Sequence, residues 1–395
     1  MKGKPAKHVL VIPSWYPPKG GYFFREHALA LAEAGLKVDV LAGLHTSLRS
    51  LRPGNLLQVR ETEINTIGRV KEYLKKYWII PYSNRGNFHG WVNMMLRFYK
   101  SYEQQAGKPG LILAHSSIWA GLVAAFIKEK YGVPYVITEH RSRFVYNTKE
   151  AREMFEPWFF PYLKTAFENA AAVVTVSESL QPFIREIAPQ AEGKLHSIPN
   201  MVDTGFFIPA GEKNKGKPFR FFSLANLIPL KGMDILIEAF ARANQARPGV
   251  LQLVIGGDGP ERARLEGLVS EKELQKQIIF TGKLRRQQVK DELQQGHAFV
   301  LASHFEAFGV VFIEAMACGL PVIATRAGGP ESFITEGQGI LLEPGKVELL
   351  AQAMLDMQEH YDRYLPEEIR RDTISRFGKQ AVAQQYLELF DTIIK

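Results

Sequence analysis

The sequence predicts an α/β protein of two domains, each built on a doubly wound parallel sheet. Short apolar runs of strand length alternate with amphipathic runs of helical length along the 395-residue chain. Such alternation is typical of parallel strands whose connecting helices cover both faces of a sheet. With 46% hydrophobic and 23% charged residues, the chain has enough apolar surface for two cores of ordinary size.

The alternation begins at the N-terminus. A strand is expected at 9–12, followed by a helix over 23–34 that stops at Gly35, and by a strand at 38–41. The same reading places the remaining elements of the first domain at 111–113 (strand), 119–131 (helix), 135–137 (strand), 171–176 (strand), 178–187 (helix) and 194–198 (strand).

Residues 209–218 are rich in Gly, Pro and Lys, the composition of an exposed connection. We therefore expect a first domain over 1–205 and a second over 206–376. Strands are expected in the second domain at 220–224, 251–255, 278–281, 298–301, 321–325 and 339–342, and helices at 234–244, 261–269, 287–294 and 310–317. Two helical stretches, 347–361 and 380–394, follow with no strand between them. Ligands of such folds bind at the carboxyl ends of the strands, here in a cleft between domains.

Charge is divided unevenly along the chain. The net charge is +8, but residues 1–205 hold 26 basic and 17 acidic residues, and the rest hold 23 and 24. The two parts thus carry +9 and −1. Membrane phosphates, nucleic acid and an anionic ligand are all compatible with this excess.

The single cysteine, Cys318, excludes an internal disulfide and a multi-cysteine metal site, which favours a reducing, cytoplasmic compartment. We expect Cys318 to be a small buried residue. The apolar run at 9–12 is too short for a signal peptide, and no run of about 18 apolar residues occurs. Any membrane contact is therefore expected to be peripheral.

The most informative segment is 303–322, which contains Glu306, Phe308, Gly309 and Glu314. Its Phe-Gly turn follows a strand and opens a helix, so the backbone N–H groups there are suited to a diphosphate. Carboxylates at this place suit sugar hydroxyls. On a helix the two glutamates would lie about 12 Å apart, beyond the roughly 5–9.5 Å of glycosidase carboxylates. This spacing argues against hydrolysis.

Five ordered blocks resemble the family 4 glycosyltransferases, which are retaining, nucleotide-sugar-dependent enzymes of GT-B fold. The blocks are the Glu-x7-Glu segment with Gly328 to Glu331 after it, Leu227 to Gly232, Gly256 to Pro260, Phe280 to Gly282, and Ile198 to Phe206. The resemblance implies two Rossmann-like domains that face each other across a cleft. It also implies that a C-terminal helix, residues 377–395, returns to the first domain.

The resemblance also implies site residues. Lys231 would neutralise the departing diphosphate, Glu306 would bind hydroxyls of the donor sugar, and Glu314 would bind the ribose. Backbone amides of the donor-binding turn and four further glycines complete the implied set: Phe308, Gly309 and Val310, then Gly20 and Gly21 in one loop, Gly257 and Gly282. Asn226 stands where the family usually has an arginine, so that phosphate neutralisation rests on Lys231 and helix N-termini or on another cation.

His140 follows a strand at the place of a family histidine beside the reacting sugar, and we assign it sugar positioning. His115 and Ser177 are weaker candidates for the same site. Glu139 and Arg141 are expected to reach the acceptor or to pair with each other.

The function expected is transfer of a sugar from a UDP- or GDP-linked donor to an acceptor hydroxyl, with retention at the anomeric carbon. No cofactor and no metal are expected, because neither Asp-x-Asp nor a His/Cys cluster occurs. Polysaccharide or glycolipid assembly in a bacterial-type cell would supply the acceptor. The basic and aromatic segment 69–78 suggests contact with the inner face of an anionic membrane, although a solvated basic surface explains it equally well.

Other classes remain as alternatives. A sugar-nucleotide epimerase or a phosphorylase could use the same fold. A non-enzymatic nucleic-acid-binding protein fits the pI of about 9.3, but no recognition helix, zinc motif or RNA-stacking motif supports it. A dinucleotide-dependent enzyme is not expected, because the first strand-to-helix loop lacks Gly-x-Gly-x-x-Gly.

Overall fold

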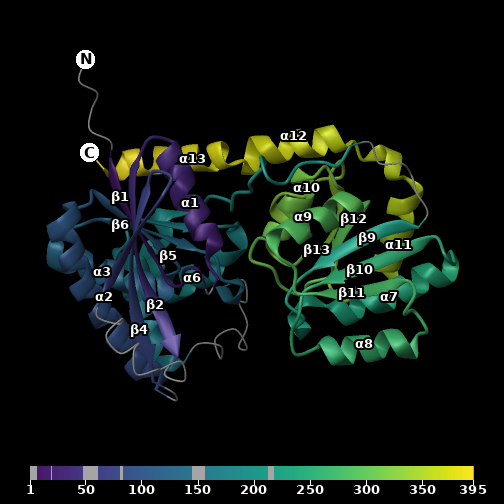
Figure 1. Ribbon diagram of the computed structural model, residues 1–395, viewed down its shortest axis with the longest axis horizontal. Coiled ribbons are helices and arrows are strands. Elements are labelled where there is room, and N and C mark those ends of the chain that lie inside the picture. The colour runs from purple at the N-terminus through teal and green to yellow at the C-terminus, as the bar shows by residue number, and fades with distance from the viewer. Residues whose placement is uncertain are drawn as a thin grey trace. The chain divides into compact units, whose positions relative to one another are not determined.

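The computed structural model describes residues 7–18, 20–47, 61–80, 83–144, 156–211 and 218–394. It divides into two compact units (Figure 1). The first comprises Met1–Val176, Leu180–Pro199 and Val382–Lys395, and the second comprises Ser177–Ser179 and Asn200–Ala381. Part of the expected connection, residues 212–217, lies outside the described residues.

The first unit contains an eight-stranded sheet in the order β3-β4-β2-β1-β5-β6-β7-β8, with every pairing parallel except β3 to β4. Its central strands are buried on both faces, as their continuous apolar runs predict. The strands are β1 (His8–Pro13), β2 (Lys37–Ser47), β3 (Thr62–Ile67), β4 (Val70–Ile79), β5 (Leu111–His115), β6 (Tyr135–Glu139), β7 (Ala172–Thr175) and β8 (Leu195–Ser197).

Helices of the first unit connect these parallel strands. They are α1 (Tyr22–Glu33), α2 (Asn84–Ala106), α3 (Leu122–Tyr131), α5 (Phe160–Asn169) and α6 (Gln181–Ile187). Helix α2 was not predicted, although it buries Trp91, Met95 and Tyr99 in the core. Its apolar residues are interleaved with Asn, Arg and Gln, which weakens the periodic signal.

Segment 69–78, expected as a basic and aromatic surface, is instead mostly strand β4 inside the sheet. Glu72, Tyr73 and Leu74 are buried there, and the Lys75 amino group lies over the ring of Phe98 in α2 at 5.6 Å. A pleated strand sends alternate side chains to opposite faces. Residues 69–78 therefore do not form a single exposed face.

The second unit contains a six-stranded sheet in the order β11-β10-β9-β12-β13-β14, and all its pairings are parallel. The expected strands are all present. Their bounds are β9 (Phe219–Leu224), β10 (Leu251–Gly256), β11 (Ile278–Gly282), β12 (Ala298–Leu301), β13 (Val322–Thr325) and β14 (Gly339–Leu342). Both units thus confirm the predicted pair of Rossmann-like domains.

Helices also connect the strands of the second unit. They are α7 (Met233–Ala246), α8 (Arg262–Glu271), α9 (Arg286–Gln295), α10 (Val310–Ala317), α11 (Val347–Glu359) and α12 (Pro366–Phe377). Helix α12 was not predicted. It begins at Pro366, a favourable first position, and packs beside α10.

The last helix, α13 (Lys379–Ile393), belongs from Val382 onward to the first unit. It lies beside α1 (Figure 1), where the ring of Tyr386 packs against His27 with centroids 4.4 Å apart. The Tyr386 hydroxyl is 3.1 Å from Oγ1 of Thr138 in β6. The end of the chain thereby completes the covering of the first sheet.

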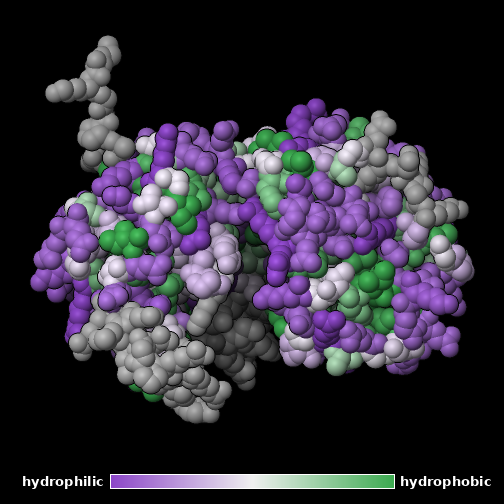
Figure 2. Space-filling model, viewed as in Figure 1, coloured by the Kyte–Doolittle hydropathy of each residue, from purple (hydrophilic) through white to green (hydrophobic). Residues whose placement is uncertain are grey.

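The visible surface of each unit is mainly hydrophilic, with hydrophobic side chains in small separate areas (Figure 2). Among the described helices, none combines the length and the apolar character that crossing a membrane requires.

Candidate active site

In the second unit, three loops at the carboxyl ends of β9, β10 and β11 are joined by backbone hydrogen bonds. The amide of Gly257 donates to the Gly282 carbonyl at 2.8 Å, and the amide of Leu227 donates to the Asp258 carbonyl at 3.0 Å. Gly257 has φ +116, and a Cβ there would lie 1.8 Å from the Ala225 carbonyl oxygen. Only glycine permits this approach. The three predicted blocks therefore meet at one edge of the sheet.

An open pocket of about 490 Å³ lies at this edge. It is lined by Asn226, Gly257, Asp258, Gly259 and Lys283. The predicted Asn226 and Gly257 thus share a pocket with Lys283, an exposed cation that was not predicted from sequence. Its position directly after the Phe280 to Gly282 block was the available signal.

The structure brings Lys231 and Glu306 into direct contact. The Lys231 Nζ lies 2.5 Å from Oε2 of Glu306, and the two side chains are only 17% and 14% exposed. A hydrogen bond of 2.9 Å from the His304 amide to the Leu230 carbonyl ties their two segments together. Gly232, with φ +59, is the N-cap of α7 and fits against Ala302, where a Cβ would lie 2.1 Å from the carbonyl oxygen.

The Phe-Gly turn opens α10 as expected, with Gly309 as its N-cap at φ +89. Helix α10 starts at Val310. In its first turn the Phe312 amide donates to the Gly309 carbonyl at 3.0 Å, whereas the N–H groups of Val310 and Val311 precede any helical carbonyl that they could bond. The Phe308 side chain is buried and packs against Phe333 with centroids 4.9 Å apart, which leaves its backbone as the part suited to a ligand. Glu314 is partly buried within the helix.

The assumption that Glu306 and Glu314 are spaced along one helix is wrong. Glu306 forms an isolated parallel bridge with Gly328 and lies before α10 begins. The Glu306 amide donates to the Ala327 carbonyl at 2.8 Å, and the Gly329 amide donates to the Glu306 carbonyl at 2.8 Å. The distance of about 12 Å between the carboxylates of Glu306 and Glu314, which assumes that both lie on one helix, therefore does not apply.

In the first unit, the loop between β1 and α1 is held by a buried carboxylate. Glu72 accepts a hydrogen bond from the Tyr16 hydroxyl at 2.6 Å and a bidentate contact from Arg25 at 2.6 and 2.9 Å. Partial burial works to lower the pKa of Arg25, but the contacts with Glu72 and Tyr16 outweigh it and raise that pKa. Gly20 and Gly21 follow with φ +103 and +74, and Gly21 is the N-cap of α1. The predicted loop thus rests on a network that sequence alone did not reveal.

His140 lies at the end of β6 beside two other histidines. Its Nε2 is 3.0 Å from Nδ1 of His115, which is fully buried at the end of β5. Burial, helped by His27 and His140, holds the pKa of His115 well below its usual value. Burial likewise lowers the pKa of His27 in α1 to about 3, with His140 as a smaller cause. The structure therefore joins the predicted His140 to the weaker candidate His115.

The expectation that Glu139 reaches an acceptor is wrong, because this carboxylate is fully buried. It accepts hydrogen bonds from the Ser116 hydroxyl, the Ser117 hydroxyl and the backbone amides of Ser117, His140 and Arg141. The guanidinium of Arg141 instead lies over the ring of Trp15 at 5.1 Å. Glu139 thus shapes the backbone that carries His140.

Two other sequence candidates are buried. Cys318 is buried, as predicted. Ser177 is buried too, with its hydroxyl 2.7 Å from that of Ser179. No group of three or more His, Cys, Asp or Glu side chains suited to a metal ion is found in the described ranges.

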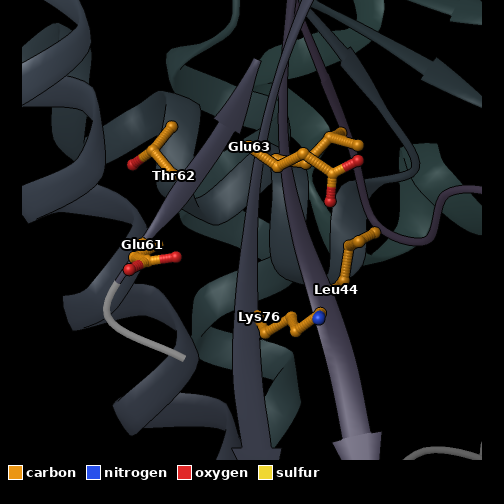
Figure 3. A pocket seen from close by; sticks show the side chains of 6 residues that line it. Leu44, Glu61, Thr62, Glu63 and Lys76 are labelled. Atoms are coloured by element: carbon orange, nitrogen blue, oxygen red, sulfur yellow. The ribbon is translucent and has the colours of Figure 1, made fainter. Parts of the chain in front are cut away.

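A second pocket, of about 350 Å³, lies on β2, β3 and β4 and contains none of the predicted site residues. Figure 3 shows Glu63 and Lys76 extending toward the side of Leu44. Its lining is Leu44, Glu61, Thr62, Glu63, Leu74 and Lys76. The carboxylates of Glu61 and Glu63 line the same pocket as Lys76 and weaken the attraction of β4 to an anionic surface.

Two family models match the chain in sequence. Glycosyltransferase Family 4 matches residues 20–206, and Glycosyl transferases group 1 matches residues 206–376. Together they cover every strand of the two sheets except β1, and all five blocks that carry the resemblance. The chain belongs to the family 4 glycosyltransferases.

Curated relatives of this glycosyltransferase differ in the molecule or the biosynthesis that their names state. It is 27% identical to the 2-deoxystreptamine N-acetyl-D-glucosaminyltransferase of Niallia circulans, over 92% of this chain and 94% of that protein. It is 27% identical to the putative teichuronic acid biosynthesis glycosyltransferase TuaC of Bacillus subtilis, over 90% and 89%. It is 30% identical to a phosphatidylinositol N-acetylglucosaminyltransferase subunit from Arabidopsis thaliana, over 51% of this chain and only 45% of that longer protein.

Solved structures share the fold of this glycosyltransferase. Anabaena HepE, crystallised in complex with UDP and glucose, superposes with a TM-score of 0.74 at 20% identity, over 98% of this chain and 100% of that chain. The two Rossmann-like domains are therefore those of a GT-B glycosyltransferase. Membership of this family also argues against the alternative of a non-enzymatic nucleic-acid-binding protein, which the pI alone permits.

Proposed function

We propose that this glycosyltransferase moves a sugar from a UDP- or GDP-linked donor to an acceptor hydroxyl, with retention at the anomeric carbon. The observation that carries the proposal is the contact between Lys231 and Glu306, at 2.5 Å and mostly shielded from water. HepE, which shares the fold, is described in complex with UDP and glucose, and this supports a nucleotide-sugar donor.

The ion pair suits a departing diphosphate. A lysine ammonium has three N–H groups, so Lys231 retains donors for phosphate oxygens while one contacts Glu306. Glu306 likewise retains lone pairs for sugar hydroxyls. Because negative charge grows on the leaving group, Lys231 stabilises the transition state more than the bound donor. The first-turn amides of α10 add partial positive charge, so we propose no metal or cofactor.

Retention follows from front-face transfer. The acceptor oxygen forms its bond to the anomeric carbon on the face from which the diphosphate departs, and a donor phosphate oxygen takes the acceptor proton. We assign Glu314 to the ribose hydroxyls, Gly257 and Gly282 to the nucleoside, Gly20 and Gly21 to the diphosphate, and His140 to the sugar. The protein then contributes position and charge stabilisation, without a covalent intermediate.

The acceptor we propose is a growing polysaccharide or a lipid-linked sugar in a bacterial-type cell, met at the cytoplasmic face of the membrane. The names of TuaC and of the phosphatidylinositol transferase support these two acceptor classes. The +9 charge of residues 1–205 supports an anionic surface as the meeting place.

The proposal is tested in two steps. Melting temperatures with UDP, GDP and their sugars should rise for one nucleotide series only, because a ligand that binds the folded state stabilises it. The product formed with that donor should then show, by NMR of the anomeric proton, the configuration of the donor. Inversion would overturn the mechanism, and epimerised donor in the absence of acceptor would indicate an epimerase.

Membrane contact has a separate test. We expect sedimentation with vesicles containing phosphatidylserine to decline as salt is raised from about 50 to about 500 mM, with no sedimentation with phosphatidylcholine alone. Equal binding to both kinds of vesicle, or to neither, would contradict an electrostatic contact.

A further inference from the structure

His115 is fully buried and uses only one of its two ring nitrogens. Its Nδ1 faces Nε2 of His140 at 3.0 Å, while its own Nε2 has no hydrogen-bond partner. One proton must lie between the two facing nitrogens, and either histidine could supply it. The position of that proton decides what His140 offers to a ligand.

Burial favours one of the two arrangements. If His140 donated, the His115 proton would sit on Nε2 as a buried N–H without an acceptor. If His115 donates from Nδ1, its Nε2 is a bare lone pair, and unpaired buried acceptors are tolerated better than unpaired buried donors. The ring of His115 is held by stacking on Phe24, with centroids 4.5 Å apart and planes at 27°.

We propose that His115 is a positioning residue, which donates from Nδ1 to Nε2 of His140 and thereby places the His140 proton on Nδ1. This inference rests on the proposed function, in which His140 contacts the donor sugar. His140 then meets the sugar as a hydrogen-bond donor. It does not act as a base through Nε2, because that lone pair is already engaged.

The aromatic surroundings keep this pair in one arrangement. The rings of Phe23 and Phe24 stand edge-on to His140 at 5.2 and 5.4 Å, and His27 stands edge-on to His115 at 5.1 Å. The backbone amide of His140 donates to Oε1 of the buried Glu139 at 2.9 Å. Both ring and backbone of His140 are thus held before a ligand arrives.

The proton position is measured by long-range ¹H–¹⁵N NMR of the full-length protein labelled in histidine, with His140→Gln used to assign the signals. Nδ1 of His140 should have the shift of a protonated nitrogen, and Nε2 that of a bare one. In His115→Phe, which keeps a ring but no nitrogen, the proton should move to Nε2, its usual place in water. A proton on Nε2 in the wild-type protein would overturn the proposal and leave the proposed function intact.

Transfer kinetics test the consequence for the reaction. His115→Phe should lower kcat by about 10-fold, the scale of losing a partner that orients a histidine, while the melting temperature stays within a few degrees. His115→Asn, which keeps a donor near the Nδ1 position, should recover part of the rate. His27→Phe is the control and its rate should stay normal, because the variant keeps the ring that stands edge-on to His115 and the Nε2 that it removes has no hydrogen-bond partner.

The outcomes separate the two claims. If His140→Gln and His115→Phe both leave transfer unchanged, the role of His140 in the proposed function fails and the positioning role fails with it. If His140→Gln lowers the rate but His115→Phe does not, only the positioning role is overturned.

Discussion

The strongest single-residue assignment is Lys231, which pairs with Glu306 and is mostly buried. Lys231→Ala should lower the rate of transfer by at least about 10²-fold, equivalent to about 2.7 kcal/mol, because one donor to the leaving group is lost. Steady-state kinetics with the donor identified by melting measure this loss. Lys272→Ala, which removes a lysine paired with Glu238 at 2.8 Å in the same unit, is the control and should be normal. A near-normal rate for Lys231→Ala would remove the assignment.

Because Asn226 stands where the family usually has an arginine, a residue other than position 226 would supply the second positive charge beside Lys231. Lys283 lines the same pocket as Asn226. We expect Lys283→Ala to raise KM for the donor by about 10-fold with little change in kcat, since an exposed charge aids binding in both ground and transition states. Adding Asn226→Arg to this variant should restore part of the affinity. The exposed Lys276 gives the control variant Lys276→Ala. An unchanged KM for Lys283→Ala would show that Lys283 does not supply the second positive charge.

The buried histidine His27 predicts how stability depends on pH. Its pKa is about 3 in the folded protein and about 6.5 when unfolded. As pH falls from the unfolded pKa toward the folded one, the unfolded chain binds a proton that the folded chain does not, so the free energy of unfolding falls. The slope for one proton is about 1.4 kcal/mol per pH unit. Between these two pKa values, the free energy of unfolding measured with urea should change with pH less steeply in His27→Phe than in the wild-type protein, by about this amount per pH unit. The same pH dependence in both proteins would contradict a His27 that is neutral in the folded state.

At the scale of elements, the start of α7 depends on a glycine that touches backbone. A Cβ at Gly232 would lie 2.1 Å from the Ala302 carbonyl oxygen, at a φ of +59. Gly232→Ala should therefore lower the free energy of unfolding by about 1–3 kcal/mol and lower transfer by displacing Lys231. At Gly267 in α8, an added Cβ would meet nothing within 4 Å. Gly267→Ala should raise the free energy of unfolding by about 0.5–1 kcal/mol. Equal changes in the free energy of unfolding for Gly232→Ala and Gly267→Ala would contradict the close approach of Gly232 to Ala302.

Elements that were missed show where local pattern fails. Helix α2 and strands β3 and β4 were not predicted, because their polar residues interrupt the apolar spacing. In β4 the buried carboxylate of Glu72 is stabilised by Tyr16 and Arg25, which come from another part of the chain. A buried charge of this kind cannot be distinguished from a surface charge without its partners.

At the scale of the whole molecule, the end of the chain belongs to the first unit although it follows the second in sequence. Truncation after Ala381 removes Tyr386 and Phe390, both buried, from the covering of the first sheet. We expect the first unit to unfold at lower urea than in the full chain, monitored by the fluorescence of Trp91 and its neighbours. Tyr386→Phe, which loses only the contact to Thr138, should cost about 1 kcal/mol. Equal urea midpoints for the truncated and full chains would contradict this role.

Sequence alone determined the parallel strands of both sheets other than β4, the helix start at Gly309 and the glycine-rich blocks, because apolar periodicity and backbone-permissive glycines are local properties. Family resemblance added roles for Lys231, Glu306 and His140. Only the tertiary structure decided that Lys231 contacts Glu306, that Glu139 is buried, and that His115 faces His140. Those facts depend on sheet register and on hydrogen bonds between loops far apart in sequence, which no local pattern encodes.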